Sequence, residues 1–253
     1  MSSTLVHAVT GGASGIGAAT ARLLAAQGHR VVVLDRSEPP DAVAGTESIA
    51  LDVSDEAAVA RAFRQIGQQF GRLDGLVNSA GIESARLIRR MAAQDWRRVV
   101  DVNLTGTMLC TREAAALMRA GGQGGSVVNV ASIAGKRMSY SGDAAYTASK
   151  AAVLGFTRHA GFELAADRIR VNAICPGPTL TPMITRNLSP ERIEAVAATV
   201  PLGRWVQPED VAQAIAFLLS PAAAMCTGTS LDVDGGVLVS NGGRVEDYFR
   251  HRP

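Results

Sequence analysis

Tyr146 and Lys150 stand four positions apart in Tyr-Thr-Ala-Ser-Lys, a spacing that could support proton transfer. On a helix both side chains would share one face. A phenol has a pKa of ~10, too high for acid–base work near neutrality, and a neighbouring ammonium favours the tyrosinate and lowers that value. Ser132, fourteen residues upstream, carries a hydroxyl that could donate a hydrogen bond to a reacting oxygen. The three residues therefore predict an acid–base site.

A second group of residues could bind a dinucleotide. The sequence Thr-Gly-Gly-Ala-Ser-Gly-Ile-Gly occupies positions 10–17, between an apolar run at Val6–Val9 and a helical pattern over Ile16–Gln27. Glycines let the backbone turn sharply beside a pyrophosphate, and the next helix offers free N–H groups and a positive dipole end. The contacts expected here come from Gly11, Ser14, Gly15, Ile16 and Gly17.

Asp35 bears on the choice of cofactor. It follows the second apolar run, Val31–Leu34, and lies 18 residues beyond the last glycine of the turn. Its carboxylate could accept hydrogen bonds from the adenosine ribose and would repel a 2′-phosphate. Arg36 acts in the opposite sense, because a guanidinium can hold that phosphate. We expect NAD, with NADP less favoured. Asp52 and Val53 either meet the adenine ring or, through the aspartate, cap the next helix.

Short apolar runs alternate with helical patterns along the chain and would position these residues. The runs are Val6–Val9, Val31–Leu34, Glu47–Leu51, Leu76–Asn78, Val127–Val130, Ile169–Ile174 and Leu231–Val233. Such alternation predicts an α/β fold with a parallel sheet covered on both faces, which binds ligands at the carboxyl ends of its strands. One long helical stretch is expected from Trp96 to Met118. Residues 1–253 are expected to form a single domain with a lid at about 177–207 and a tail at 241–253.

Composition and charge exclude several classes of protein. Apolar residues make up 47% and charged residues 19% of the 253 residues, which excludes a disordered chain. A net charge of +2 gives no reason to expect nucleic acid or a membrane as partner. No apolar run approaches the ~18 residues of a membrane span. The three cysteines and four histidines show no metal-ligand spacing. We expect no metal and a cytoplasmic protein.

Together these motifs resemble the short-chain dehydrogenase/reductase family, of the classical type. The resemblance extends from Thr10 to Gly236. It rests on TGGASGIG at 10–17, Asp35, Asp52-Val53, NSAG at 78–81, Asn103, Ser132, YTASK at 146–150, PGPTLTPM at 176–183, PLGR at 201–204 and DVDGG at 232–236. Two departures are visible. Ser79 replaces a usual asparagine, and the 14-residue gap between Ser132 and Tyr146 is one residue longer than is common.

The resemblance implies a fold and a mechanism. The fold is a single-domain Rossmann-type, doubly wound parallel sheet of about seven strands in the order 3-2-1-4-5-6-7. Tyr146 would be the general acid–base, and Ser132 would steady the substrate oxygen. Lys150 would bind the nicotinamide ribose and lower the tyrosine pKa, while Asn103 would hold a water for proton relay. Further cofactor contacts are implied for Asn78, Ala80, Gly81, Pro176, Gly177, Thr179 and Thr181.

The expected reaction is hydride transfer between nicotinamide and a small secondary alcohol or ketone, in a homotetramer. Candidate substrate contacts are Glu83, Met138, Tyr140, Met183, Arg186 and Trp205. One alternative is a 3-oxoacyl-carrier-protein reductase using NADPH, which the basic segment Arg86–Arg98 favours and Asp35 opposes. Another is a nucleotide-binding regulator without catalysis, which the intact acid–base residues disfavour. Enoyl reductases space their tyrosine and lysine further apart, and nucleotide-sugar epimerases carry a further substrate domain.

Overall fold

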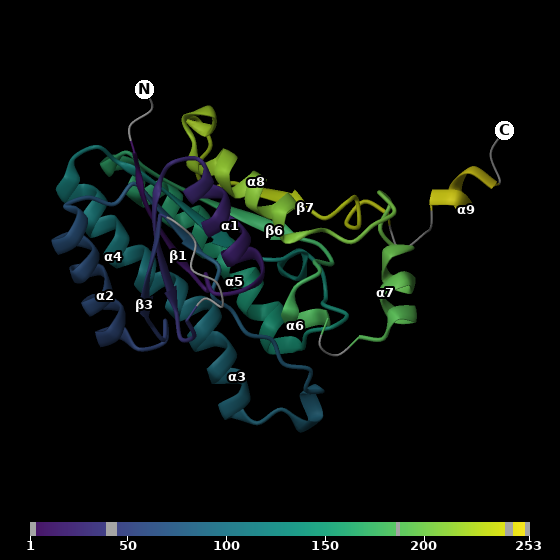
Figure 1. Cartoon of the computed structure of the whole chain (residues 1–253). Helices are drawn as coiled ribbons and strands as arrows, with labels where there is room; N and C mark the ends of the chain where they lie inside the picture. Colours follow the sequence, from purple (N-terminus) through teal and green to yellow (C-terminus); the bar gives the residue numbers. More distant parts are fainter. Residues whose placement is uncertain (1–3, 39–44, 186–187, 241–244, 251–253) are drawn as a thin grey trace.

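Seven parallel strands form one sheet in the computed structural model, in the order β3-β2-β1-β4-β5-β6-β7 (Figure 1). The strands are β1 (Val6–Thr10), β2 (Arg30–Asp35), β3 (Thr46–Ala50), β4 (Gly75–Asn78), β5 (Gly125–Val130), β6 (Ile169–Pro176) and β7 (Ser230–Val233). The structure describes residues 4–38, 45–185, 188–240 and 245–250. The expected strand order and doubly wound fold are confirmed.

Helices cover both faces of this sheet. On one face α1 (Gly15–Ala26) packs against α8 (Pro208–Leu219), and on the other lie α2 (Glu56–Phe70), α4 (Gly106–Gly121) and α5 (Ala144–Glu163) (Figure 1). The shorter helices are α3 (Ala93–Val100), α6 (Pro182–Thr185), α7 (Pro190–Ala197) and α9 (Val245–Arg250). Single 3-10 turns occur at Ile88–Arg90, Ile133–Gly135, Leu164–Asp167 and Pro221–Ala223.

Strand alternation explains the continuous apolar runs. Val32 and Leu34 of β2 pack into the core under α2 and α4, whereas Val31 and Val33 pack into the core under α1 and α8. Successive side chains of a strand point to opposite faces, so a strand covered on both faces must be apolar at every position. The central strands β1 and β4 are buried along their whole length for the same reason.

The carboxyl ends of the strands bring the polar residues to one edge of the sheet. β1 ends at Thr10, β2 at Asp35 and β4 at Asn78, and Ser132 follows the end of β5 by two residues. The strand order reverses between β1 and β4. At such a reversal the connections leave in opposite directions and open a crevice for a ligand.

The helical stretch expected from Trp96 to Met118 is confirmed, and it contains one irregular turn. A π-helical turn at Asp101–Thr105 separates α3 from α4. The hydroxyl of Thr107, at the start of α4, donates to the carbonyl oxygen of Asn103 within this turn at 2.9 Å. An expanded turn changes which side chains face inward, and Asn103 is only 1% exposed.

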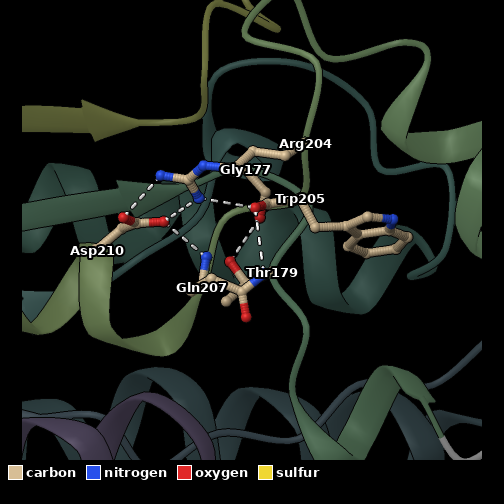
Figure 2. A network of polar contacts seen from close by, with 6 residues as sticks. All are labelled: Gly177, Thr179, Arg204, Trp205, Gln207 and Asp210. Atoms are coloured by element: carbon tan, nitrogen blue, oxygen red, sulfur yellow. Dashed lines mark hydrogen bonds and ion pairs between the residues drawn. The ribbon is translucent and has the colours of Figure 1, made fainter.

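The segment predicted as a lid contains α6 and α7 and returns to the sheet through a bridge between Thr179 and Val206. Figure 2 shows the polar contacts at its base. Arg204 donates to both carboxylate oxygens of Asp210, at 2.6 and 3.0 Å, and the backbone N–H of Gln207 donates to the same carboxylate at 2.8 Å. These contacts fasten one end of the segment to the start of α8. That the segment opens and closes stays a prediction.

Most of the tail predicted at 241–253 lies outside the described residues, and only α9 of it is described. In the described part of the chain, no helix combines the length and the apolar character needed to cross a membrane.

Candidate active site

The glycine turn between β1 and α1 leaves no room for side chains. Gly11 has a φ of +66°, and a Cβ there would lie 2.8 Å from the Cα of Ala80. A Cβ on Gly17 would lie 2.2 Å from the carbonyl oxygen of Gly11. Gly15 also adopts a left-handed conformation, at a φ of +53°, and its Cβ position is 3.3 Å from Thr181 Cγ2. The turn therefore brings Ala80 and Thr181 to the N-terminus of α1.

The first turn of α1 has the properties of a phosphate site. Ser14 is its N-cap, but the serine side chain makes no capping hydrogen bond, and the turn contains no acidic residue. The N–H groups there can satisfy an anion, which the helix dipole also favours. Gly15, Ile16 and Gly17 supply these N–H groups, as the sequence predicts. The residues present fit a pyrophosphate.

Thr10, which the sequence analysis did not single out, connects this turn to the end of β4. Its hydroxyl oxygen accepts hydrogen bonds from the N–H groups of Ser79 and Ala80, each at 3.1 Å, and the residue is 1% exposed. Its place at the carboxyl end of a strand was the available signal. Because these bonds use the backbone of residue 79, a serine there in place of asparagine leaves them intact.

Asp35 is oriented by two backbone donors. Its carboxylate accepts from the N–H groups of Ala13 at 3.1 Å and Ser37 at 3.0 Å. A carboxylate offers about four acceptor positions, so capacity remains for ribose hydroxyls. The guanidinium of Arg36 lies 4.0 Å from the Asp52 carboxylate. Arg36 thus has an acidic neighbour within the protein.

Asp52 holds the loop after β3. Its carboxylate accepts from the N–H and the hydroxyl of Ser54, at 2.9 and 2.6 Å, and these bonds lower its pKa. The interpretation in which Asp52 caps the next helix is wrong, because Asp55 is the N-cap of α2 and accepts from the N–H of Ala58. Val53 is buried beside it. A contact of either Asp52 or Val53 with adenine stays a prediction.

Ser132, Tyr146 and Lys150 come together at the carboxyl edge of the sheet. Ser132 precedes the 3-10 turn after β5, and Tyr146 and Lys150 lie in the first two turns of α5. The side chain of Ser132 is close enough to the Tyr146 phenol to lower its pKa, and Lys150 Nζ lies 5.7 Å from the centroid of the tyrosine ring. Gly135 permits this approach, because a Cβ there would lie 2.7 Å from the carbonyl oxygen of Lys150.

Burial changes the titration of both Tyr146 and Lys150. Burial raises the pKa of Tyr146 to about 12; the side chain of Ser132 opposes that rise and the Glu83 carboxylate adds to it. Burial also lowers the pKa of Lys150 to about 8, and its Nζ donates to the Val130 carbonyl at 2.7 Å. Burial is the largest influence on the phenol in the absence of a cofactor, and the effect of Lys150 on the tyrosine pKa stays a prediction.

The side-chain amide of Asn103 hydrogen-bonds the backbone of the segment that follows β4. Its Oδ1 accepts from the Ile82 N–H at 2.8 Å, and its Nδ2 donates to the Ile82 carbonyl at 2.9 Å and to Ser149 Oγ at 3.0 Å. A Cβ on Gly81 would lie 3.4 Å from Asn103 Oδ1 and 3.6 Å from Lys150 Nζ. Asn103 therefore positions this segment beside the lysine. Its role in holding a water stays a prediction.

Asn78 belongs to a buried polar network that sequence reasoning missed. Its Nδ2 donates to Thr111 Oγ1 at 3.0 Å and to Asn129 Oδ1 at 2.9 Å, and Asn129 donates onward to Thr157 Oγ1 at 3.0 Å. The Oδ1 of Asn78 is buried with no hydrogen-bond partner among the described residues. An asparagine inside the apolar run Val127–Val130 was the signal for this network, which joins β4 and β5 to α4 and α5. Support of the ribose by Asn78 stays a prediction.

Of the predicted cofactor residues around the end of β6, some make contacts within the loop that follows the strand, and one contacts the glycine turn. Gly177, which follows Pro176, packs on β7, where a Cβ would lie 2.7 Å from the Cα of Asp234. The hydroxyl of Thr179 donates to the Gly177 carbonyl at 2.9 Å, as Figure 2 shows, so this threonine serves the loop. Thr181, next to Gly15, is the residue that approaches the predicted cofactor site.

The loop at 136–145 borders Tyr146 and carries two of the predicted substrate contacts. Met138 and Tyr140 are 67% and 89% exposed. A Cβ on Gly142 would lie 2.7 Å from Cδ1 of the Tyr146 ring. Asp143, a further residue that sequence reasoning missed, is the N-cap of α5 and accepts from the Tyr146 N–H at 3.0 Å. Its position three residues before the tyrosine is the capping spacing and could have revealed it.

The remaining substrate candidates lie in different places. Trp205 is 5% exposed, and its ring N–H donates to the Ile193 carbonyl at 2.7 Å, so it fastens α7 to the end of the loop. Met183 is part of α6, and Arg186 lies outside the described residues. Glu83 is half-buried, and burial followed by the charge of Asp143 raises its pKa.

Across the residues that the structure describes, no cluster of three or more histidine, cysteine or acidic side chains could hold a metal ion. Cys110, Cys175 and Cys226 are free thiols, and burial raises the pKa of Cys110 to about 12 and that of Cys175 to about 11. The thiols of Cys110 and Cys175 are therefore protonated near neutrality and poor nucleophiles.

Comparison with known proteins agrees with this geometry. The family model described as "Enoyl-(Acyl carrier protein) reductase" matches residues 11–238. A cis-4-hydroxycyclohexanecarboxylate dehydrogenase of Sinomonas cyclohexanicum is 43% identical over 91% of this chain and 95% of its own, and a 3-oxoacyl-[acyl-carrier-protein] reductase of Synechocystis is 42% identical over 92% and 97%. A ligand-free aldohexose dehydrogenase of Thermoplasma acidophilum superposes with a TM-score of 0.87 at 33% identity, covering 93% of this chain and 94% of that one.

The fold and the site define a nucleotide-binding oxidoreductase. The chain belongs to the short-chain dehydrogenase/reductase family, of the classical type, as the sequence motifs indicated.

Proposed function

We propose that this protein is an NAD-dependent oxidoreductase that interconverts a small secondary alcohol and its ketone. The observation that carries the proposal is the meeting of Ser132, Tyr146 and Lys150 at the edge of the sheet that also holds the glycine turn. A phenol with a serine hydroxyl beside it and an amine near its ring is equipped to move one proton on a substrate oxygen.

In this mechanism Tyr146 accepts the proton of the substrate hydroxyl during oxidation and returns it to the carbonyl oxygen during reduction. Ser132 donates a hydrogen bond to the same oxygen and stabilises its developing charge. The nicotinamide supplies the hydride acceptor or donor and, when oxidised, a positive charge. Tyr146, whose pKa burial raises to about 12, gives up its proton near neutrality only with a positive charge close by.

The predicted cofactor residues divide the dinucleotide between them. Gly11, Ser14, Gly15, Ile16 and Gly17 would hold the pyrophosphate, and Asp35 would hold the adenosine ribose. Lys150, Asn78, Ala80, Gly81 and Thr181 would surround the nicotinamide half. The fixed Asp35 carboxylate favours NAD, because its negative charge would repel the 2′-phosphate of NADP. Arg36, which could otherwise bind that phosphate, lies 4.0 Å from the Asp52 carboxylate.

A second candidate function is 3-oxoacyl-carrier-protein reduction with NADPH. Relatives with that name are 38 to 42% identical to this chain. Leu87 and Ile88 are 58% and 79% exposed within the basic segment Arg86–Arg98. An apolar patch among arginines suits an acidic carrier protein. Asp35 stands against NADPH, so this function ranks second.

We further propose a cytoplasmic homotetramer, as is usual in the family. In support, α4 and α5 present the exposed small residues Ala116 and Ala151, and Phe162 of α5 is 84% exposed. Small residues allow helices of two subunits to approach closely, and an exposed phenylalanine gains from burial. The three free thiols suit a reducing compartment.

The test compares NAD⁺ and NADP⁺ with a panel of secondary alcohols, and NADH and NADPH with the matching ketones and an acetoacetyl thioester, each followed by nicotinamide absorbance. We expect turnover of alcohols and ketones with preference for NAD(H). Tyr146→Phe should lower kcat by at least ~100-fold, while NADH binding, measured by fluorescence, stays close to wild type. Wild-type turnover in Tyr146→Phe would contradict the assigned role. A preference for the thioester with NADPH would establish the second candidate instead.

A further inference from the structure

The segment that follows β4 is clamped at two points on either side of Glu83. Before it, the amide of Asn103 binds both the N–H and the carbonyl of Ile82, at 2.8 and 2.9 Å. After it, the hydroxyl of Ser84 donates to the carboxylate of Asp143. Asn103 and Asp143 are 1% and 8% exposed, so both clamps are buried. The backbone of Glu83 is therefore held in one place.

That place adjoins the acid–base group. Asp143, which holds one clamp, also accepts from the N–H of Tyr146 at 3.0 Å. Gly81, on the other side of Glu83, has its Cβ position 3.6 Å from Lys150 Nζ. Glu83 thus lies between the start of the helix that carries Tyr146 and the segment that touches the lysine. Its carboxylate is close enough to the tyrosine to raise the pKa of the phenol.

The Glu83 carboxylate makes no hydrogen bond or ion pair with the residues that the structure describes. It is half-buried, and no cation or hydrogen-bond donor in the described part of the chain pairs with it. Burial and, after it, the charge of a second carboxylate, that of Asp143, raise the pKa of Glu83. A partly desolvated carboxylate gains when a ligand supplies a donor and loses when a ligand brings another negative charge.

We propose that Glu83 determines substrate specificity by accepting a hydrogen bond from a hydroxyl or ammonium group that the substrate carries near its reacting carbon, and by disfavouring substrates with a carboxylate at that place. The inference rests on the proposed function, because it assigns the substrate class of the same site.

The test measures kcat/KM for wild type, Glu83→Gln and Glu83→Leu on substituted cyclohexanols, with the preferred nucleotide. Substrates that carry an additional hydrogen-bond donor form the donor arm: the 1,2-, 1,3- and 1,4-cyclohexanediols and 4-aminocyclohexanol. Cyclohexanol and 4-methylcyclohexanol, which carry no second polar group, form the neutral arm. The anionic arm is cis-4-hydroxycyclohexanecarboxylate. Glu163→Gln is the matched control, because that glutamate lies at the far end of α5 with a side chain 68% exposed. Circular dichroism verifies that each variant is folded.

We expect wild type to prefer its best donor substrate over the neutral arm by at least ~10-fold, the value of one hydrogen bond to a charged group. Glu83→Leu should remove that preference, and both variants should raise the relative kcat/KM of the carboxylate by ~10-fold or more. The ratio between substrates is the readout, since any change at Tyr146 affects every alcohol alike. A preference for the amine over the diols identifies an ammonium as the donor. Glu163→Gln should keep the wild-type ratios.

A pH profile adds an independent measurement. Removing a negative charge beside Tyr146 favours the tyrosinate, so Glu83→Gln should move the acidic limb of kcat/KM for cyclohexanol to lower pH. Wild-type ratios in Glu83→Leu, with turnover retained, would overturn this inference and leave the proposed function standing. No turnover of any alcohol or ketone by wild type, with either nucleotide, would overturn both.

Discussion

His7 makes the stability of the fold depend on pH between about pH 7 and pH 4. The residue lies in the central strand β1 and is 2% exposed, and its Nδ1 has no hydrogen-bond partner among the described residues. Burial lowers its pKa from 6.5 to about 4; the nearby His29 adds to this, and Asp74 opposes it. The folded protein therefore keeps this imidazole neutral at pH 5, where an unfolded chain would protonate it.

The sign and size of the effect follow from linkage. Between pH 6.5 and pH 4 the unfolded state binds more protons than the folded state, so the free energy of unfolding falls as the pH falls. With pKa values of 6.5 unfolded and about 4 folded, His7 costs about 2 kcal/mol between pH 7 and pH 5 and about 3 kcal/mol between pH 7 and pH 4. Carboxylates with lowered pKa values lose their contribution to the free energy of unfolding mainly below pH 4.

Urea unfolding followed by circular dichroism, at pH 7 and pH 5 and one protein concentration, measures this difference. Wild type should lose about 2 kcal/mol at pH 5, whereas His7→Leu, of similar size and without a titrating group, should lose less than about 0.5 kcal/mol. His159→Leu is the control, since that side chain is 80% exposed, and it should keep the wild-type difference. An equal pH dependence in wild type and His7→Leu would refute the reasoning.

Two further predictions concern the cofactor site. Asp35→Ala should shift the ratio of kcat/KM for NAD⁺ over NADP⁺ toward NADP⁺ by at least ~10-fold, because a like charge near the 2′-phosphate is removed. Asp35→Asn should do the same while it keeps an oxygen for the Ala13 N–H, and an unchanged ratio in both would contradict the NAD assignment. Gly17→Ala should weaken NADH binding by ~10-fold or more, because its Cβ would meet the Gly11 carbonyl at 2.2 Å. Gly155→Ala, whose Cβ would have only an ordinary contact at 3.8 Å, should bind NADH normally.

The sequence alone determined the architecture, and it predicted which side chains meet at the proposed acid–base site. Apolar runs such as Val31–Leu34 predicted strands covered on both faces, because every position of such a strand must be apolar. The glycine turn and the four-residue spacing of Tyr146 and Lys150 are local patterns, and local geometry dictates what they place together. Strand order and family membership followed from the order of the motifs, and both are confirmed.

The tertiary structure decided what depends on contacts between distant segments. Only the folded chain brings Thr10 to the backbone at residue 79, Asn103 to Ile82 and Asp143 to the segment that carries Glu83. It also raises the pKa of the Tyr146 phenol by burial, because desolvation depends on everything packed around the phenol, whereas spacing along the chain reports only one neighbour. Hydrogen bonds between side chains far apart in sequence and the depth of burial are properties of packing, which periodicity in a single sequence does not encode.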